Sequence, residues 1–112
     1  MMNDPESSLE VVRFAGELDI SRRDEVAAAL ERAKAAPALL VDLSEVPYAD
    51  STVLAELLRF HAEAQANGRR IAVLIHSPQI SRIMEYAGVS AAFPVFNDRG
   101  AALTHLTGTN AT

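Results

Sequence analysis

Short apolar runs alternate along the chain with segments whose apolar residues recur every three or four positions. Such runs predict strands, and the most apolar of them suit strands that are covered on both faces. The segments with helical spacing predict amphipathic helices that bury one face. The predicted strands cover residues 9–14, 39–43, 71–75 and 93–96. The predicted helices follow them and begin near residues 21, 51, 77 and 98.

Residues with strong local preferences mark the ends of these helices. Ser21 is a candidate N-cap of the first helix. Ser77 followed by Pro78 is a strong helix start, because proline suits the first helical position. Gly68 suits the left-handed position that follows a helix, and Asp98 is expected to cap the last helix. These signals support the boundaries that the apolar pattern predicts.

The order of predicted elements is strand then helix, repeated four times. Such alternation predicts an α/β layer fold with a mainly parallel sheet, because helical crossovers return the chain to the same end of the sheet. Residues 16–19 could pair with the first strand as a short hairpin, which would make the sheet mixed. We expect a single domain over residues 9–106, with flexible tails at residues 1–8 and 107–112.

Composition excludes several classes of function. The chain has 112 residues, of which 49% are hydrophobic, and no apolar run approaches the roughly 18 residues of a membrane span. The absence of cysteine excludes thiolate nucleophiles and thiolate metal sites. Ten basic against 15 acidic residues give a net charge of −5, which argues against direct nucleic-acid binding. We therefore expect a cytoplasmic protein without membrane insertion.

Motifs for catalysis or cofactor binding are not apparent. His61, His76 and His105 fall on different predicted elements, without metal-ligand spacing. Ser51 lies between a strand and a helix but lacks the flanking glycines of a nucleophile elbow. The glycines are scattered and form no phosphate-binding loop. We expect no catalytic residue, no metal and no cofactor, and therefore no enzymatic activity of this chain.

Asp50, Ser51 and Thr52 form a cluster of short polar residues just before an apolar helix. In one interpretation the cluster is structural: one residue is the N-cap, and the others satisfy amide groups of the first turn. In the other, an exposed hydroxyl accepts a phosphoryl group, which the helix N-terminus would stabilise. The phosphate would add roughly −1.5 to −2 charges and could switch partner binding without refolding. The residues alone leave both interpretations open, with Ser51 as the first candidate acceptor and Thr52 as the second.

The sequence around this cluster resembles a STAS domain of the anti-sigma factor antagonist family. The resemblance extends from about residue 11 to residue 106, and it depends on the order and spacing of several short segments. These are GELD at residues 16–19, LVDLSEV at 40–46, YADST at 48–52, the helix at 54–67 with the strand after it, IMEYAGV at 83–89 and FPVF at 93–96. The resemblance implies a small α/β domain with about four helices packed against a sheet of four or five strands.

The resemblance also implies a function. In that family, the serine directly after the loop aspartate is phosphorylated by an anti-sigma factor that is also an ATP-dependent serine kinase. That serine corresponds to Ser51. The unphosphorylated form binds the anti-sigma factor and releases a sigma factor, phosphorylation blocks the binding, and a phosphatase restores it. Contacts with the kinase are implied for the loop aspartates and for the first turns of the following helix: Asp19, Asp50, Thr52, Val53 and Glu56.

One position departs from the family pattern. The family usually has glycine where this chain has Val53. A glycine near a helix start lets a partner's backbone approach closely, and valine adds a branched side chain where that approach would occur. STAS domains also occur as non-phosphorylated subunits of lipid-trafficking ABC transporters, docking on the ATPase, and Val53 favours that alternative. A sensor domain for a small ligand is a third class, with no phosphate-binding loop to support it.

Overall fold

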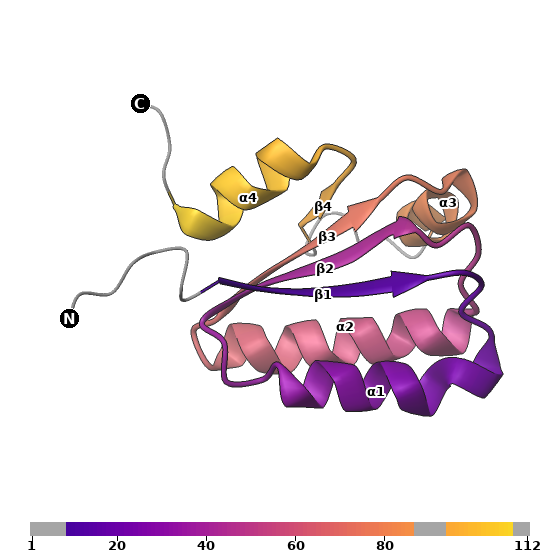
Figure 1. The fold of residues 1–112 in the computed structure, drawn as a ribbon, viewed down its shortest axis with the longest axis horizontal. Coiled ribbons are helices and arrows are strands. Elements are labelled where there is room, and N and C mark those ends of the chain that lie inside the picture. Colours follow the sequence, from indigo (N-terminus) through magenta and orange to yellow (C-terminus); the bar gives the residue numbers. More distant parts are fainter. Residues whose placement is uncertain (1–8, 87–93, 109–112) are drawn as a thin grey trace.

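The computed structural model describes residues 9–86 and 94–108, which contain a four-stranded sheet (Figure 1). The strands lie in the order in which they occur along the chain, and each neighbouring pair is parallel. The strands are β1 (Leu9–Ala15), β2 (Ala38–Glu45), β3 (Arg70–Ile75) and β4 (Val95–Phe96). The helices are α1 (Arg23–Arg32), α2 (Ser51–Ala66), α3 (Pro78–Tyr86) and α4 (Arg99–Thr107), with a short 3-10 helix η2 (Ile20–Arg22) before α1. The predicted α/β layer fold is confirmed.

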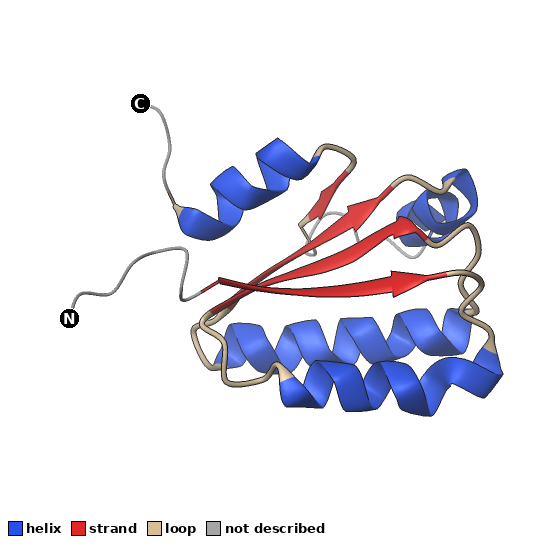
Figure 2. Ribbon diagram, viewed as in Figure 1, coloured by secondary structure: helices blue, strands red, loops and turns tan. Residues whose placement is uncertain are grey.

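The helices cover both faces of the sheet unequally. Helices α1 and α2 lie along one face, α4 lies on the other, and α3 sits near the carboxyl ends of β2 and β3 (Figures 1 and 2). Each face of the sheet has its own hydrophobic core, and alternate residues of β2 point into one or the other. Leu39 and Val41 pack in the larger core with α1, α2 and α3, and Leu40 packs in the smaller core under α4. A strand buried on both faces needs apolar residues at successive positions, which explains the run at residues 39–41.

The predicted hairpin at residues 16–19 is wrong. Instead of turning back along β1, the chain continues in the direction of β1, and Leu18 forms a parallel bridge with Ala49 in the loop after β2. Gly16 allows this path, because its φ of 80° lies in the left-handed region and its amide donates to the carbonyl of Glu45. The described strands therefore form a purely parallel sheet.

Most predicted helix ends are confirmed, with one exception. Ser77 and Asp98 accept hydrogen bonds from amides in the first turns of α3 and α4, and Gly68 has the expected positive φ. Ser21 is not an N-cap: Asp19 caps η2, and α1 continues from η2 at Arg23.

Three predicted segments lie at the limits of the described residues. Residue 93 of the strand predicted at 93–96 and the predicted tail at residues 1–8 lie outside these residues. Helix α4 includes Thr107, which was expected to begin the second tail, and residues 109–112 of that tail lie outside the described residues.

A fully buried carboxylate fastens α4 to the sheet. Asp42 of β2 accepts hydrogen bonds on one oxygen from the amide and hydroxyl of Ser44, at 2.9 and 2.6 Å. Its other oxygen pairs with Arg13 of β1 at 3.2 Å and with Arg99 of α4 at 2.5 Å. Burial opposes ionisation, but the hydrogen bonds from Ser44 and the ion pair with Arg99 outweigh it and lower the pKa of Asp42 to about 2.

Candidate functional site

The loops that follow β1 and β2 run side by side beyond the end of the sheet. The amide of Leu18 donates to the carbonyl of Tyr48, and the amide of Asp50 donates to the carbonyl of Leu18, both at 2.9 Å. The side chains of Leu18 and Ala49 are fully buried beneath this pairing. The loop that leads to η2 is thereby held against the loop that leads to α2.

The pairing places the start of α2 on the surface with Ser51 as its first residue. Asp50 is the N-cap, and its carboxylate accepts the amide of Thr52 at 2.8 Å. Ser51 is exposed, and its hydroxyl makes no hydrogen bond to any residue that the structure describes. The capping role that the sequence left open therefore belongs to Asp50, and the Ser51 hydroxyl is available for chemistry.

Asp19 occupies the matching position at the start of η2. Its carboxylate accepts the amide of Ser21 at 3.0 Å and the hydroxyl of Ser21 at 2.5 Å. The hydrogen bond from this hydroxyl lowers the pKa of Asp19, although slight burial acts in the opposite direction. Because Leu18 pairs with the loop at Tyr48 and Asp50, the structure brings Asp19, Asp50 and Ser51 to the same end of the sheet.

Val53 and Glu56 do not face outward. Val53 has no exposed area and packs in the larger core, which corrects the expectation that its branched side chain meets a partner. Glu56 is almost fully buried, and its carboxylate pairs with Arg23 of α1 at 2.9 Å and with Arg59. The hydrogen bond from Arg59 is the main reason why the pKa of Glu56 is lowered, against the opposing effect of burial. The exposed stripe of α2 runs instead through Ser51, Ala55 and Arg59.

Two exposed apolar side chains were missed by the sequence reasoning. Ile20 is 62% exposed and directly follows Asp19, and Tyr48 is 39% exposed and lies two residues before Asp50. Isolated apolar residues in polar loops give no periodic signal, so the sequence pattern did not mark them. We define the Ser51 surface as six residues of the two paired loops and the first turns of α2, all of them exposed except the half-buried Asp50: Asp19, Ile20, Tyr48, Asp50, Ser51 and Ala55.

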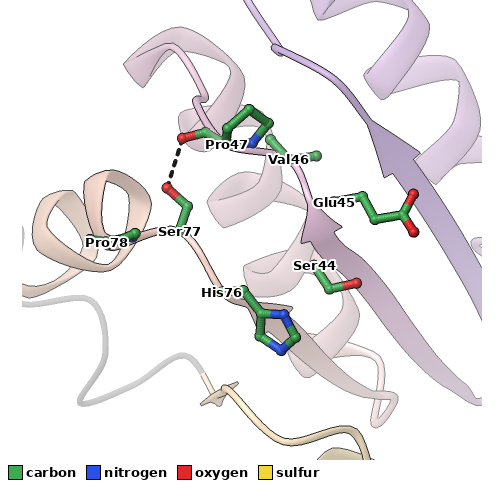
Figure 3. Close-up of a pocket in the computed structure, with 7 residues that line it drawn as sticks. All are labelled: Ser44, Glu45, Val46, Pro47, His76, Ser77 and Pro78. Carbon is green, nitrogen blue, oxygen red and sulfur yellow. Dashed lines mark hydrogen bonds between the residues drawn. The ribbon is translucent and has the colours of Figure 1, made fainter.

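A pocket of about 440 Å³ lies between the loop after β2 and the loop after β3 (Figure 3). Its lining includes Val46 and Pro47 from the first loop and His76, Ser77 and Pro78 from the second. None of the residues of the Ser51 surface lines it. In residues 9–86 and 94–108 no three metal-ligating side chains gather, and no described helix is long and apolar enough to cross a membrane.

Comparisons with known proteins show which family the chain resembles. A family model described as "Mlab, STAS domain" matches residues 2–96, whereas no curated protein matches the sequence. An anti-sigma factor antagonist from Mycobacterium paratuberculosis is similar in structure, with 26% identity, a TM-score of 0.80 and coverage of 86% of this chain and 83% of that chain.

Two other solved structures share the fold. The Bacillus cell fate determinant SpoIIAA in its phosphorylated form has 21% identity and a TM-score of 0.63, with coverage of 81% of this chain and 85% of that chain. A sulfate transporter family protein from Wolinella succinogenes has 19% identity and a TM-score of 0.71, with coverage of 91% and 89%. Because the family model spans most of the sequence, the chain belongs to the STAS domain family.

Proposed function

We propose that this protein is an anti-sigma factor antagonist whose binding to an anti-sigma factor is switched off by phosphorylation of Ser51. The observation that carries the proposal is the exposure of Ser51 at the first position of α2, where Asp50 supplies the cap and the Ser51 hydroxyl has no hydrogen-bond partner among the residues that the structure describes. The names of two similar structures support it, one as an anti-sigma factor antagonist and one as SpoIIAA in a phosphorylated form.

In the proposed reaction this chain is the substrate, and the anti-sigma factor is the serine kinase. The Ser51 oxygen attacks the γ-phosphorus of ATP, the bond to the β-phosphate oxygen breaks, ADP leaves, and the hydroxyl proton passes to a base of the kinase. The kinase holds the ATP, so this chain needs no cofactor. A phosphatase hydrolyses the phosphoserine and restores the hydroxyl. Because the reaction uses ATP and regulates a sigma factor, it takes place in the cytoplasm.

The surroundings of Ser51 explain how a phosphate would act as a switch. Amide groups and the dipole of the α2 N-terminus stabilise an anion at the first helical position, so the fold tolerates the modification. Asp19 and Asp50 already place two carboxylates at this end of the sheet. A phosphate adds roughly −1.5 to −2 charges to this surface, which a partner matched to the unmodified surface would have to desolvate or repel.

Incubation with ATP and the anti-sigma-type serine kinases of the same genome tests the proposal by mass spectrometry. The wild-type chain should gain a single phosphate, Ser51→Ala should gain none, and Thr52→Ala should be modified as the wild type is. Thr52 is the matched control because its hydroxyl lies next in the chain but is half-buried. A wild-type chain that no such kinase modifies, or a phosphate that persists in Ser51→Ala, would refute the assignment.

Ile20 and Tyr48 are expected to anchor the anti-sigma factor. Ile20→Glu and Tyr48→Ala should each weaken its binding by about tenfold or more, because exposed apolar and aromatic side chains are typical anchors of interfaces. Tyr86→Ala is the matched control, since Tyr86 is 85% exposed but lies at the end of α3. Isothermal titration calorimetry measures the affinities, and equal losses for Tyr48→Ala and Tyr86→Ala would contradict the proposed surface.

A second candidate function is a STAS subunit that docks on the ATPase of a lipid-trafficking transporter. It is favoured by the description of the matching family model. In that function the chain would bind an ABC ATPase with equal affinity before and after kinase treatment. Co-purification with an ATPase encoded next to the gene, together with no phosphate at Ser51, would favour the transporter subunit over the regulator.

A further inference from the structure

The peptide groups around Ala49 have hydrogen-bond partners on two opposite sides. On one side, Leu18 forms the bridge that joins the two loops. On the other side, the amide of Ala49 donates to Oε1 of Gln79 at 3.2 Å, and its carbonyl accepts from Nε2 of Gln79 at 3.3 Å. The side-chain amide of Gln79 thus takes the place that the backbone of a neighbouring strand would take in a sheet.

Helix α3 holds the same loop at a second point. The hydroxyl of Ser77 donates to the carbonyl of Pro47 at 2.8 Å (Figure 3) and also accepts the amide of Ile80 as the cap of α3. Ser77 is buried, so water does not readily replace either contact. The start of α3 therefore fixes the loop at residues 47 and 49, just before Asp50 and Ser51.

We propose that Gln79 is a positioning residue for the phosphorylation of Ser51. Because Ala49 lies two residues before Ser51, the orientation of its peptide sets where α2 begins and where the Ser51 hydroxyl points. Phosphoryl transfer requires this oxygen in line with the bond that breaks, and small displacements slow such steps strongly. The inference rests on the proposed function, and it adds a residue from a helix outside the Ser51 surface.

Loss of Gln79 should affect kcat and KM for the phosphorylation of Ser51 differently. Without the Gln79 amide, the buried peptide groups at Ala49 lose their partners, and the loop gains freedom at the residues that precede α2. Ile20 lies on the other loop, and Tyr48 keeps its hydrogen bond from the amide of Leu18, so the kinase still finds its docking surface. Loss of Gln79 should therefore lower kcat for phosphorylation of this chain and leave KM nearly unchanged.

Gln79→Met tests the inference, because methionine has a similar length and cannot form either hydrogen bond. Gln65→Met is the matched control, since Gln65 is exposed on α2. Hydrogen exchange followed by NMR should show faster exchange at the Ala49 and Asp50 amides, by about tenfold, in Gln79→Met alone, with the core of β2 and β3 unaffected. With the kinase and ATP, kcat should fall by about tenfold, with KM within about twofold of the wild type.

The two measurements separate the failure of this inference from the failure of the proposed function. Unchanged exchange at Ala49 and Asp50 would overturn the positioning role, whatever the kinase does. Equal kcat values for wild type and Gln79→Met would overturn it as well. A wild-type chain that gains no phosphate would instead overturn the proposed function, and with it the kinetic part of the inference.

Discussion

Asp42→Ala is expected to lower the free energy of unfolding by about 3 kcal/mol, which corresponds to a melting temperature roughly 12–20 °C lower. The substitution removes the acceptor for Ser44 and the shared partner of Arg13 and Arg99, and it leaves a cavity under α4. The two arginines are about half-exposed, so water can solvate them after the substitution. The loss of unfolding free energy therefore lies at the lower end of the range that is typical of breaking a buried ion pair. Chemical denaturation at pH 7 measures the change.

The same carboxylate predicts how stability depends on pH. Its folded-state pKa of about 2 lies below the ordinary value of 3.8, so its contribution is present above pH 3.8 and is lost as pH falls toward 2. That contribution is about 2 kcal/mol, and it should vanish in Asp42→Asn, which keeps the shape but not the charge. Asp24→Asn is the control, because the side chain of Asp24 is fully exposed. If the free energy of unfolding fell equally for Asp42→Asn and wild type as pH is lowered from 3.8 toward 2, this interpretation would be contradicted.

Ser51→Asp is expected to weaken binding of the anti-sigma factor by about 100-fold. The added carboxylate stands at the first position of α2, on the surface that already carries Asp19 and Asp50. Because it has a single charge and no phosphate geometry, its effect is a lower bound for that of phosphoserine.

Ser51→Ala is the control for this measurement and should bind within about threefold of the wild type, since the Ser51 hydroxyl has no partner among the described residues. Circular dichroism should show the same helix content in all three proteins. Wild-type affinity of Ser51→Asp in a folded state would argue against an electrostatic switch.

Local patterns predicted the elements of the fold well, because the residues that define them lie close together in the chain. The run at residues 39–43 predicted the buried strand β2, and short polar residues predicted the start of α2. The hairpin at residues 16–19 failed for a tertiary reason. Gly16 allowed a turn, but the partner of Leu18 is Ala49, whose place beside it depends on β1 and β2 being parallel.

The candidate site was predicted in part. The sequence pointed to Ser51 and Asp50, yet it could not decide which of the clustered residues is the cap. It also placed Val53 on the wrong side of α2, because a family pattern does not state which way a side chain faces. Gln79 carried no local signal, since its role depends on a contact with Ala49, 30 positions earlier.

The buried ion pairs of Asp42 in the core could not be predicted from the sequence either. Asp42 is the one charged residue within the apolar run at residues 39–43, and the structure buries its carboxylate between β1, β2 and α4. Arg99 lies 57 positions away, so no local pattern joins the two residues. Buried charges of this kind are paired through the tertiary fold, which is why sequence periodicity does not reveal them.

The central claim is that one phosphate on Ser51 ends binding to the anti-sigma factor. The most direct test titrates the anti-sigma factor with the unphosphorylated chain and with the same chain after phosphorylation by the kinase, using isothermal titration calorimetry. The phosphorylated chain should bind at least about 100-fold more weakly, and phosphatase treatment should restore the affinity. Equal affinity of the two forms would contradict the account.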